Sequence, residues 1–169
     1  NEIIGILGPN GCGKTTTIGM ILGLLKPTKG KVLVSGIEIE KQRVELLNEL
    51  NFISPYIELP KKLTVKQNLE VYGRLYDVKE LGIKIDYLCE KLRLNEFIDK
   101  ITGELSSGQK NRVSLAKSII NDPSVLLLDE PTASLDPETG DFVRSFLEEY
   151  QKEKKTSILL ASHNMAEVE

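Results

Sequence analysis

Apolar residues recur along this chain in two different periods, and the change of period divides it into stretches. Short, nearly continuous apolar runs, typical of buried parallel strands, occupy residues 2–7, 125–130 and 157–162. Between residues 63 and 120 the apolar positions instead recur every three or four residues, the spacing of one helix face. The pattern therefore predicts an α/β protein that carries a helical insert.

Shorter segments complete the predicted elements. Residues 26–30 end the first helix, because proline cannot continue the hydrogen-bond ladder and glycine allows a turn. In the insert, Thr64 followed by Gln67 predicts a capping box, and Gly82 is expected to separate two helices. The further elements expected are helices at 16–25, 42–50, 106–121 and 138–150 and strands at 31–35, 37–40 and 51–54.

Composition limits the possible functions. The 169 residues suffice for one domain with a smaller lobe, and no apolar run approaches the roughly 18 residues of a membrane helix. A net charge of −3 argues against general nucleic-acid binding, and two cysteines, Cys12 and Cys89, fit a reducing cytosol. Because the chain starts without methionine and stops within a helical pattern, we expect it to be a segment of a longer protein.

A glycine-rich loop lies between the first strand and the first helix. Its sequence, Gly8-Pro9-Asn10-Gly11-Cys12-Gly13-Lys14-Thr15, fits the phosphate-loop pattern G-x-x-x-x-G-K-[ST] at every specified position. Glycines let backbone N–H groups turn inward around a triphosphate, and the helix N-terminus adds its unpaired N–H groups. Lys14 supplies a charge to the outer phosphates, Thr15 can ligate magnesium, and Thr16 is placed to donate to an inner phosphate.

Two carboxylates follow the apolar run at 125–128. Asp129 and Glu130 stand at the carboxyl end of this predicted strand, where ligands bind in parallel sheets. Asp129 can hold magnesium directly or through water, together with Thr15, and Glu130 can orient and deprotonate the water that attacks a γ-phosphate. The sequence thus predicts magnesium-dependent hydrolysis of a nucleoside triphosphate.

Two further features remain open on local grounds. Ser106 and Gln109 form a capping box, yet the same serine and glycine also create an exposed helix N-terminus, which is a ready anion site. His163, the only histidine, follows the last predicted strand, where it is either a packed ring or a functional one.

Taken together, these residues resemble the nucleotide-binding domain of ATP-binding-cassette (ABC) proteins. Five elements occur in the family's order: Walker A at Gly8–Thr16, the signature at Leu105–Gln109, Walker B at Val125–Glu130, the D-loop at Ser134–Asp136, and the switch histidine, His163. The resemblance implies a P-loop NTPase with a RecA-like, mostly parallel sheet and an inserted α-helical subdomain. It assigns residues 1–58 and 123–169 to the ATP-binding core and residues 59–122 to the helical signature subdomain.

The resemblance also implies roles for individual residues. Two copies would form a head-to-tail dimer that encloses two ATP molecules, each between Walker A of one copy and the signature of the other. Glu130 then resembles the general base, His163 would sense the γ-phosphate, and Asp136 would bridge the subunits. The nucleotide-contacting residues implied are Gly8, Pro9, Asn10, Gly11, Cys12, Gly13, Lys14, Thr15 and Thr16 of one copy, and Ser106, Ser107, Gly108 and Gln109 of the other.

The sequence departs from the family pattern in two places. Ser107 replaces the second glycine of the usual L-S-G-G-Q signature, so a side chain must fit close to phosphate. The glutamine expected after the strand at 52–54 is absent, and Ser54 or Pro55 occupies that region.

The leading prediction is the ATPase subunit or domain of an ABC transporter, cytoplasmic and held at the membrane by a separate or fused permease. Residues 63–69 resemble the L-T-V-x-E-N-L stretch of bacterial exporters. One alternative is a soluble ABC ATPase that acts on ribosomes. A chromosome-maintenance ATPase is set aside, because a long coiled coil would separate Walker A from the signature. No nucleic-acid partner is expected.

Overall fold

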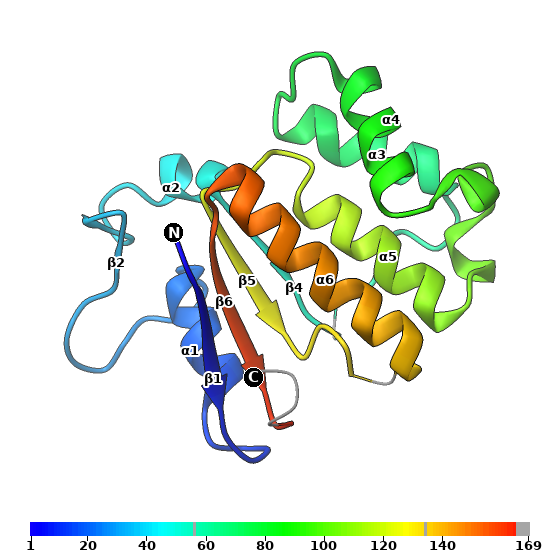
Figure 1. Ribbon diagram of the computed structural model, residues 1–169. Coiled ribbons are helices and arrows are strands. Elements are labelled where there is room, and N and C mark those ends of the chain that lie inside the picture. The colour runs from blue at the N-terminus through cyan, green and yellow to red at the C-terminus, as the bar shows by residue number, and fades with distance from the viewer. Residues whose placement is uncertain (56, 134, 165–169) are drawn as a thin grey trace.

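The computed structural model describes residues 1–55, 57–133 and 135–164, and its centre is a parallel four-stranded sheet. The strand order is β1-β6-β5-β4, with β1 at Ile3–Leu7, β4 at Leu50–Ile53, β5 at Val125–Asp129 and β6 at Ser157–Ser162 (Figure 1). Every pairing is parallel, and the register sets Leu7 opposite Ser162 and Asp129 opposite Ala161. The carboxyl ends of three adjacent strands therefore meet at one edge of the sheet.

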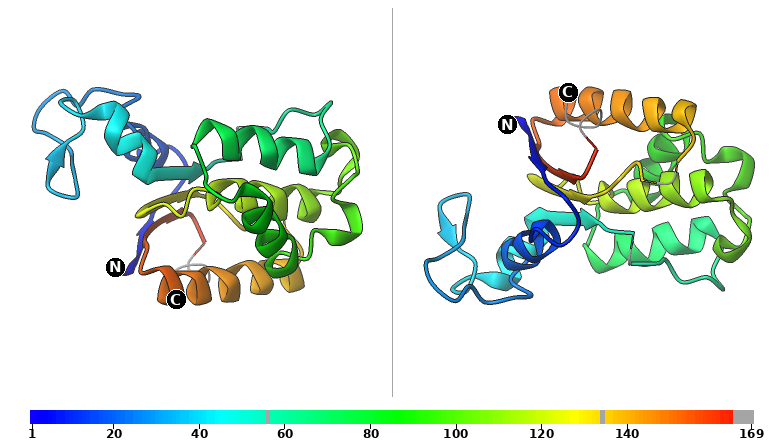
Figure 2. Two further views of the ribbon diagram at one scale, coloured as in Figure 1. Left: turned by 90° about the horizontal axis from the view of Figure 1, so that it is seen from above. Right: turned by 90° about the horizontal axis from the view of Figure 1, so that it is seen from below.

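Helices cover both faces of this sheet. Helix α1 (Lys14–Ile21) lies on one face, and α6 (Pro137–Lys154) lies on the other (Figure 2). Strand β5 alternates between them: Leu127 packs with Ile18 of α1, whereas Leu126 and Leu128 join the cluster that contains Phe146 of α6. The continuous apolar run of β5 is thus explained by burial on both faces, as in doubly covered parallel sheets.

The segment between α1 and β4 is less regular than the sequence predicts. The two expected strands shrink to β2 (Leu33–Val34) and β3 (Ile37–Glu38), a short antiparallel pair, and α2 (Arg43–Glu49) leads directly into β4. Val34, Ile39, Leu46 and Leu50 form a small separate core there. Strand β1 is an edge, and its Ile3 and Ile4 are 43% and 48% exposed.

The insert is helical, as the spacing predicts. It contains α3 (Val65–Leu75), α4 (Leu81–Lys91), two 3₁₀ turns, η1 (Asn95–Phe97) and η2 (Thr102–Glu104), and then α5 (Ser107–Ser118). Both capping boxes form, at Thr64 with Gln67 and at Ser106 with Gln109. The prediction for Gly82 is wrong: Gly82 lies inside α4, and the break falls at residues 76–80, where Asp77 and Glu80 have positive φ.

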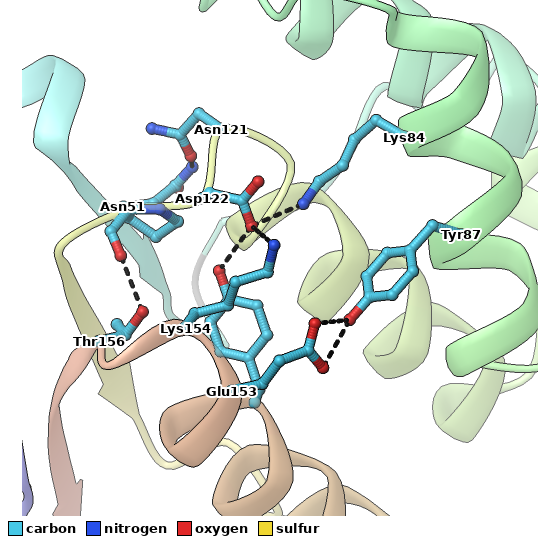
Figure 3. Close-up of polar contacts among 10 residues, drawn as sticks. Asn51, Lys84, Tyr87, Asn121, Asp122, Glu153, Lys154 and Thr156 are labelled. Atoms are coloured by element: carbon cyan, nitrogen blue, oxygen red, sulfur yellow. Dashed lines mark hydrogen bonds and ion pairs between the residues drawn. The ribbon is translucent and has the colours of Figure 1, made fainter.

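A polar cluster joins the insert to the core at the turn before β5, and we call it the Asp122 junction. Asp122 Oδ1 lies 2.7 Å from Lys84 Nζ of α4 and 3.4 Å from Lys154 Nζ of α6, and the Tyr150 hydroxyl donates to it at 3.4 Å. Nearby, the Tyr87 hydroxyl donates to Glu153 (Figure 3). One carboxylate thus fixes α4, α6 and the turn to one another.

None of the helices in the described part of the chain is long and apolar enough to cross a membrane.

Candidate nucleotide-binding site

The glycine loop between β1 and α1 owes its path to two left-handed residues. Gly11 has φ 84° and Gly13 has φ 104°, a region that favours glycine, and no atom would lie within 4 Å of a Cβ at either position. At Gly8 a Cβ would stand 2.6 Å from Cys12 Sγ, so a larger residue there would displace the Cys12 side chain. Gly13 caps α1 without a side-chain hydrogen bond, so the first N–H groups of this helix remain available to an anion.

Lys14 is buried at the start of α1 and turns back into the loop. Its Nζ donates to the carbonyl oxygens of Gly8 at 2.6 Å and Pro9 at 3.3 Å, and it lies 3.8 Å from Glu130 Oε1. The side chain is only 7% exposed, so the ammonium is held inside the loop that it is predicted to share with phosphates.

Thr15 and Asp129 meet across the sheet edge, as expected for the predicted magnesium ligands. The Thr15 hydroxyl donates to Asp129 Oδ2 at 2.8 Å, and Asp129 is 2% exposed at the end of β5. A hydroxyl and a carboxylate are hard oxygen donors of the kind that Mg²⁺ prefers, so this pair fits the ion. No cluster of three His, Cys, Asp or Glu side chains that could hold a metal occurs in the described residues.

Glu130 follows β5 and adopts a positive φ of 51°. Its N–H donates to the Ala161 carbonyl at 2.8 Å, which fixes the backbone against β6. Oε2 of Glu130 lies 2.8 Å from Nδ1 of His163 and accepts from the Ser162 hydroxyl at 3.4 Å. Glu130 is therefore oriented by the end of β6, and His163, 51% exposed, stands beside it.

A cavity of about 310 Å³ connects these groups. It is lined by Asn10, Gly11, Gly13, Lys14, Thr15, Thr16, Asp129 and Glu130. The structure thus brings most of the predicted Walker A and Walker B residues to one space. Pro9, whose carbonyl accepts from Lys14, and the exposed Cys12 belong to the same loop but lie outside this lining.

The predicted signature residues lie elsewhere in the chain's own fold. Ser106 and Ser107 are exposed at the N-terminus of α5, with Gly108 and Gln109 half-buried behind them, and none of the four lines the phosphate-loop cavity. Ser106 Oγ accepts from the Gln109 N–H at 3.3 Å. A Cβ on Gly108 would lie 3.5 Å from Thr139, so the N-termini of α5 and α6 are neighbours.

Asp136, predicted to bridge subunits, is the exposed N-cap of α6. It accepts from the Thr139 N–H at 3.0 Å and from the Thr139 hydroxyl at 2.7 Å, and these hydrogen bonds lower the pKa of its carboxyl. Ser134, which also belongs to the predicted D-loop, lies outside the described residues.

Two contacts near Glu130 were not anticipated from the sequence. One is the Ser162 hydroxyl described above. The other is Asn111 of α5, whose Nδ2 donates to the Pro131 carbonyl at 2.6 Å. Both are single polar residues within otherwise ordinary strand and helix patterns, so no local signal identifies them.

Comparison with known proteins decides the family. The family model described as ABC transporter matches residues 1–133. The chain belongs to the ABC transporter family. It is 36% identical to the ABC transporter ATP-binding protein NatA of Bacillus subtilis, over 99% of this chain and 69% of NatA. It is 40% identical to the Nod factor export ATP-binding protein I of Rhizobium johnstonii, over 99% of this chain but only 54% of that protein.

Solved structures agree with this assignment. The dimeric ATP-binding cassette MJ0796 bound to ADP and Pi superposes with a TM-score of 0.87 at 26% identity, covering 99% of this chain and 77% of that one. The cbiO1 protein of Clostridium perfringens, part of the ABC transporter complex cbiONQ, gives 0.83 at 33% identity, covering 96% and 67%. The predicted family and P-loop NTPase fold are confirmed. This ABC chain is an ATP-binding, ATP-hydrolysing domain of transporter type.

Proposed function

We propose that this ABC domain drives a transporter by closing head-to-tail on a second copy around two ATP molecules. The observation that carries the proposal is the separation of two sets of residues. Loop, lysine and carboxylates share one cavity, whereas Ser106 and Ser107 stand exposed on α5 and line no part of it. A second copy turned head-to-tail would supply its Ser106–Gln109 segment to this cavity, and the dimeric MJ0796 cassette supports such an assembly.

The same separation divides the chain into two subdomains. We assign residues 1–58 and 123–169 to the ATP-binding core and residues 59–122 to the helical signature subdomain. The Asp122 junction lies at this boundary and holds α4 to α6. The apolar core continues across it, since Leu69 and Leu88 of the insert belong to the same cluster as Phe146 and Tyr150.

In this mechanism the loop N–H groups and the N-terminus of α1 hold the phosphates, and Lys14 leaves the Gly8 and Pro9 carbonyls to contact the outer ones. Thr15 and Asp129 would hold Mg²⁺, which neutralises charge that develops on the phosphates. Glu130 takes the proton of the attacking water, and His163, 2.8 Å from Glu130, contacts the γ-phosphate side of the site. Ser106, Ser107 and Gly108 of the second copy complete the phosphate contacts, and Asp136 lies at the interface.

The membrane partner is inferred from the relatives. The cbiO1 protein is part of a transporter complex, and NatA is named as an ABC transporter protein. We infer that a permease domain or subunit carries the substrate path and holds this domain at the cytoplasmic face, with no nucleic-acid partner. The tagged full-length protein, purified from solubilised membranes, should co-purify with an integral membrane protein or should itself contain a membrane domain. Recovery on ribosomes would overturn the transporter assignment in favour of a translation ATPase.

The decisive test of the site is Glu130→Gln. It keeps the size of the side chain but replaces the carboxylate base by an amide, so kcat should fall by about a hundredfold or more while ATP still binds. Size-exclusion chromatography should then show an ATP-dependent dimer that persists. Glu148→Gln is the matched control, because Glu148 is 63% exposed on α6 and makes only a 4.0 Å surface pair with Lys152. Wild-type turnover in the Glu130 variant would remove Glu130 from the role of base.

A further inference from the structure

We propose that Asn111 is a positioning residue that joins the signature helix to the hydrolytic carboxylate of the same chain. The proposal rests on the function proposed above, in which α5 serves the ATP of the second copy and Glu130 serves the chain's own ATP. The hydrogen bond of the Asn111 side chain would then couple the two ATP sites to each other.

The contact is short and its two ends are well placed. Asn111 Nδ2 donates to the Pro131 carbonyl at 2.6 Å, and Pro131 is buried and directly follows Glu130. Asn111 lies four residues after Ser107 in α5, so the two side chains share one face of this helix. Both line a second cavity of about 280 Å³, which Glu130 and Pro131 also line.

The segment that Asn111 holds is not secured by its own residues alone. Glu130 has φ 51°, a conformation unfavourable for a residue with a side chain, and Pro131 has no N–H to donate. Thr132 is 8% exposed, and its buried hydroxyl makes no hydrogen bond within the described part of the chain. The Glu130 N–H donates to the Ala161 carbonyl of β6, and the Ala133 N–H donates to the Glu130 carbonyl within the segment itself. Asn111 adds a tie from the helical insert.

This geometry allows α5 to transmit a displacement from its N-terminus to the Glu130 segment. A helix is stiff along its axis, so a displacement of its N-terminus on contact with phosphate moves Asn111 as well. The amide then shifts the Pro131 carbonyl, and with it the Glu130 backbone, whose position decides whether the carboxylate reaches the attacking water. Because linkage is reciprocal, the state of the Glu130 segment also alters how strongly the same chain's Ser106–Gly108 segment engages the second copy's ATP.

The test compares variants at Asn111 in the full-length protein. Asn111→Asp keeps the size but sets a carboxylate against a carbonyl, and Asn111→Ala removes the amide at a position where alanine favours the helix. Each should lower kcat by about tenfold and bring the Hill coefficient of ATP hydrolysis towards 1, while the Kd for ATP, measured without magnesium, stays unchanged. Asn111→Gln retains a donor and should restore part of both values. Asn121→Ala, which removes an amide in the turn after α5, is the control and should leave kcat and the Hill coefficient unchanged.

The outcomes separate this inference from the proposed function. Wild-type kcat and Hill coefficient in both Asn111 variants would overturn it. A lower melting temperature with normal turnover by the folded fraction would show a merely structural role and would also overturn it. If the wild-type protein forms no ATP-dependent dimer and Glu130→Gln turns over normally, the proposed function fails. If those two tests succeed and the Asn111 variants behave as wild type, the coupling alone fails.

Discussion

Two clusters of lysine and carboxylate lie at opposite ends of β5, and we propose the one after the strand as the nucleotide site. Before the strand, Asp122 Oδ1 lies 2.7 Å from Lys84 Nζ and 3.4 Å from Lys154 Nζ, and it accepts a hydrogen bond from the Tyr150 hydroxyl at 3.4 Å. After the strand, Lys14 stands 3.8 Å from Glu130 and gives its hydrogen bonds to two backbone carbonyls. The same residue types thus occur at both ends with opposite patterns of pairing.

The difference shows what makes a charged cluster available to a ligand. At the Asp122 junction the carboxylate has two ammonium groups and a hydroxyl around it. At the phosphate loop the charged groups border a cavity of about 310 Å³, and left-handed glycines keep side chains out of the loop. Position agrees with this distinction, because ligands bind outside the carboxyl ends of parallel strands and not at their amino ends. Two substitutions test the comparison, and a third concerns Lys117, a partly buried lysine that belongs to neither cluster.

Lys14→Ala should have the largest effect. The ammonium is the only side-chain cation among the lining residues of the phosphate-loop cavity that the structure describes, so ATP affinity should fall by about a hundredfold, the loss of one charge-assisted contact. Fluorescence titration with a labelled ATP analogue measures this Kd. Lys154→Ala is the matched control at the Asp122 junction and should leave the Kd unchanged. Equal Kd values for wild type and Lys14→Ala would end the distinction between the two clusters.

Asp122→Ala should act on stability and not on binding. Burial lowers the pKa of Lys84, and the hydrogen bond to Asp122 opposes that shift, so removing the carboxylate leaves a largely buried ammonium without its partner. The free energy of unfolding should fall by about 2 kcal/mol, below the cost for a fully buried pair because Asp122 is partly exposed. Chemical denaturation measures it. Asp141→Ala, at an exposed pair with Arg144 on α6, is the control with little expected change. A weakened ATP Kd without loss of stability would contradict the assignment.

Lys117→Met should have the smallest effect and should appear only as a change in pH dependence. Lys117 Nζ lies between the rings of Phe52 and Tyr72 and donates to Asn51 at 3.1 Å, and burial lowers its pKa to about 8. In the unfolded state Lys117 has its ordinary, higher pKa. Between that pKa and the folded value of about 8, the unfolded state therefore binds more protons than the folded state. Stability therefore rises with pH across this window.

The wild-type protein should gain about 1 kcal/mol relative to Lys117→Met between pH 8 and pH 9. Urea denaturation of both proteins at each pH gives the difference. Parallel pH dependences would show that Lys117 does not titrate in this range.

Short-range chemistry made much of the fold predictable. The glycine loop, both capping boxes and the apolar run of β5 each depend on residues a few positions apart, and all form as expected. The meeting of Thr15 with Asp129 was predictable as well, because parallel strands end at a common edge.

The parts that escaped prediction depend on distant packing. Asp122 and Lys84 are 38 residues apart in the sequence, and Asn111 and Pro131 are 20 apart, so no local sequence pattern predicts either pair. Gly82 failed as a helix boundary because its conformational freedom permits a break without requiring one, and the left-handed residues Asp77 and Glu80 form the break instead. Helix α6 extends to Lys154, beyond the predicted end at residue 150, because Tyr150 packs in the core and Lys154 reaches Asp122.

The hydrogen bonds from Lys14 to Gly8 and Pro9 have a kinetic consequence. Lys14 Nζ donates to the Gly8 and Pro9 carbonyls within the loop, so it must release them before it can contact phosphate. Capture of ATP is an exchange, in which the lysine releases two carbonyls as it takes up phosphate oxygens. The observed association rate should therefore level off at high ATP concentration, at a ceiling set by how often the lysine leaves its loop.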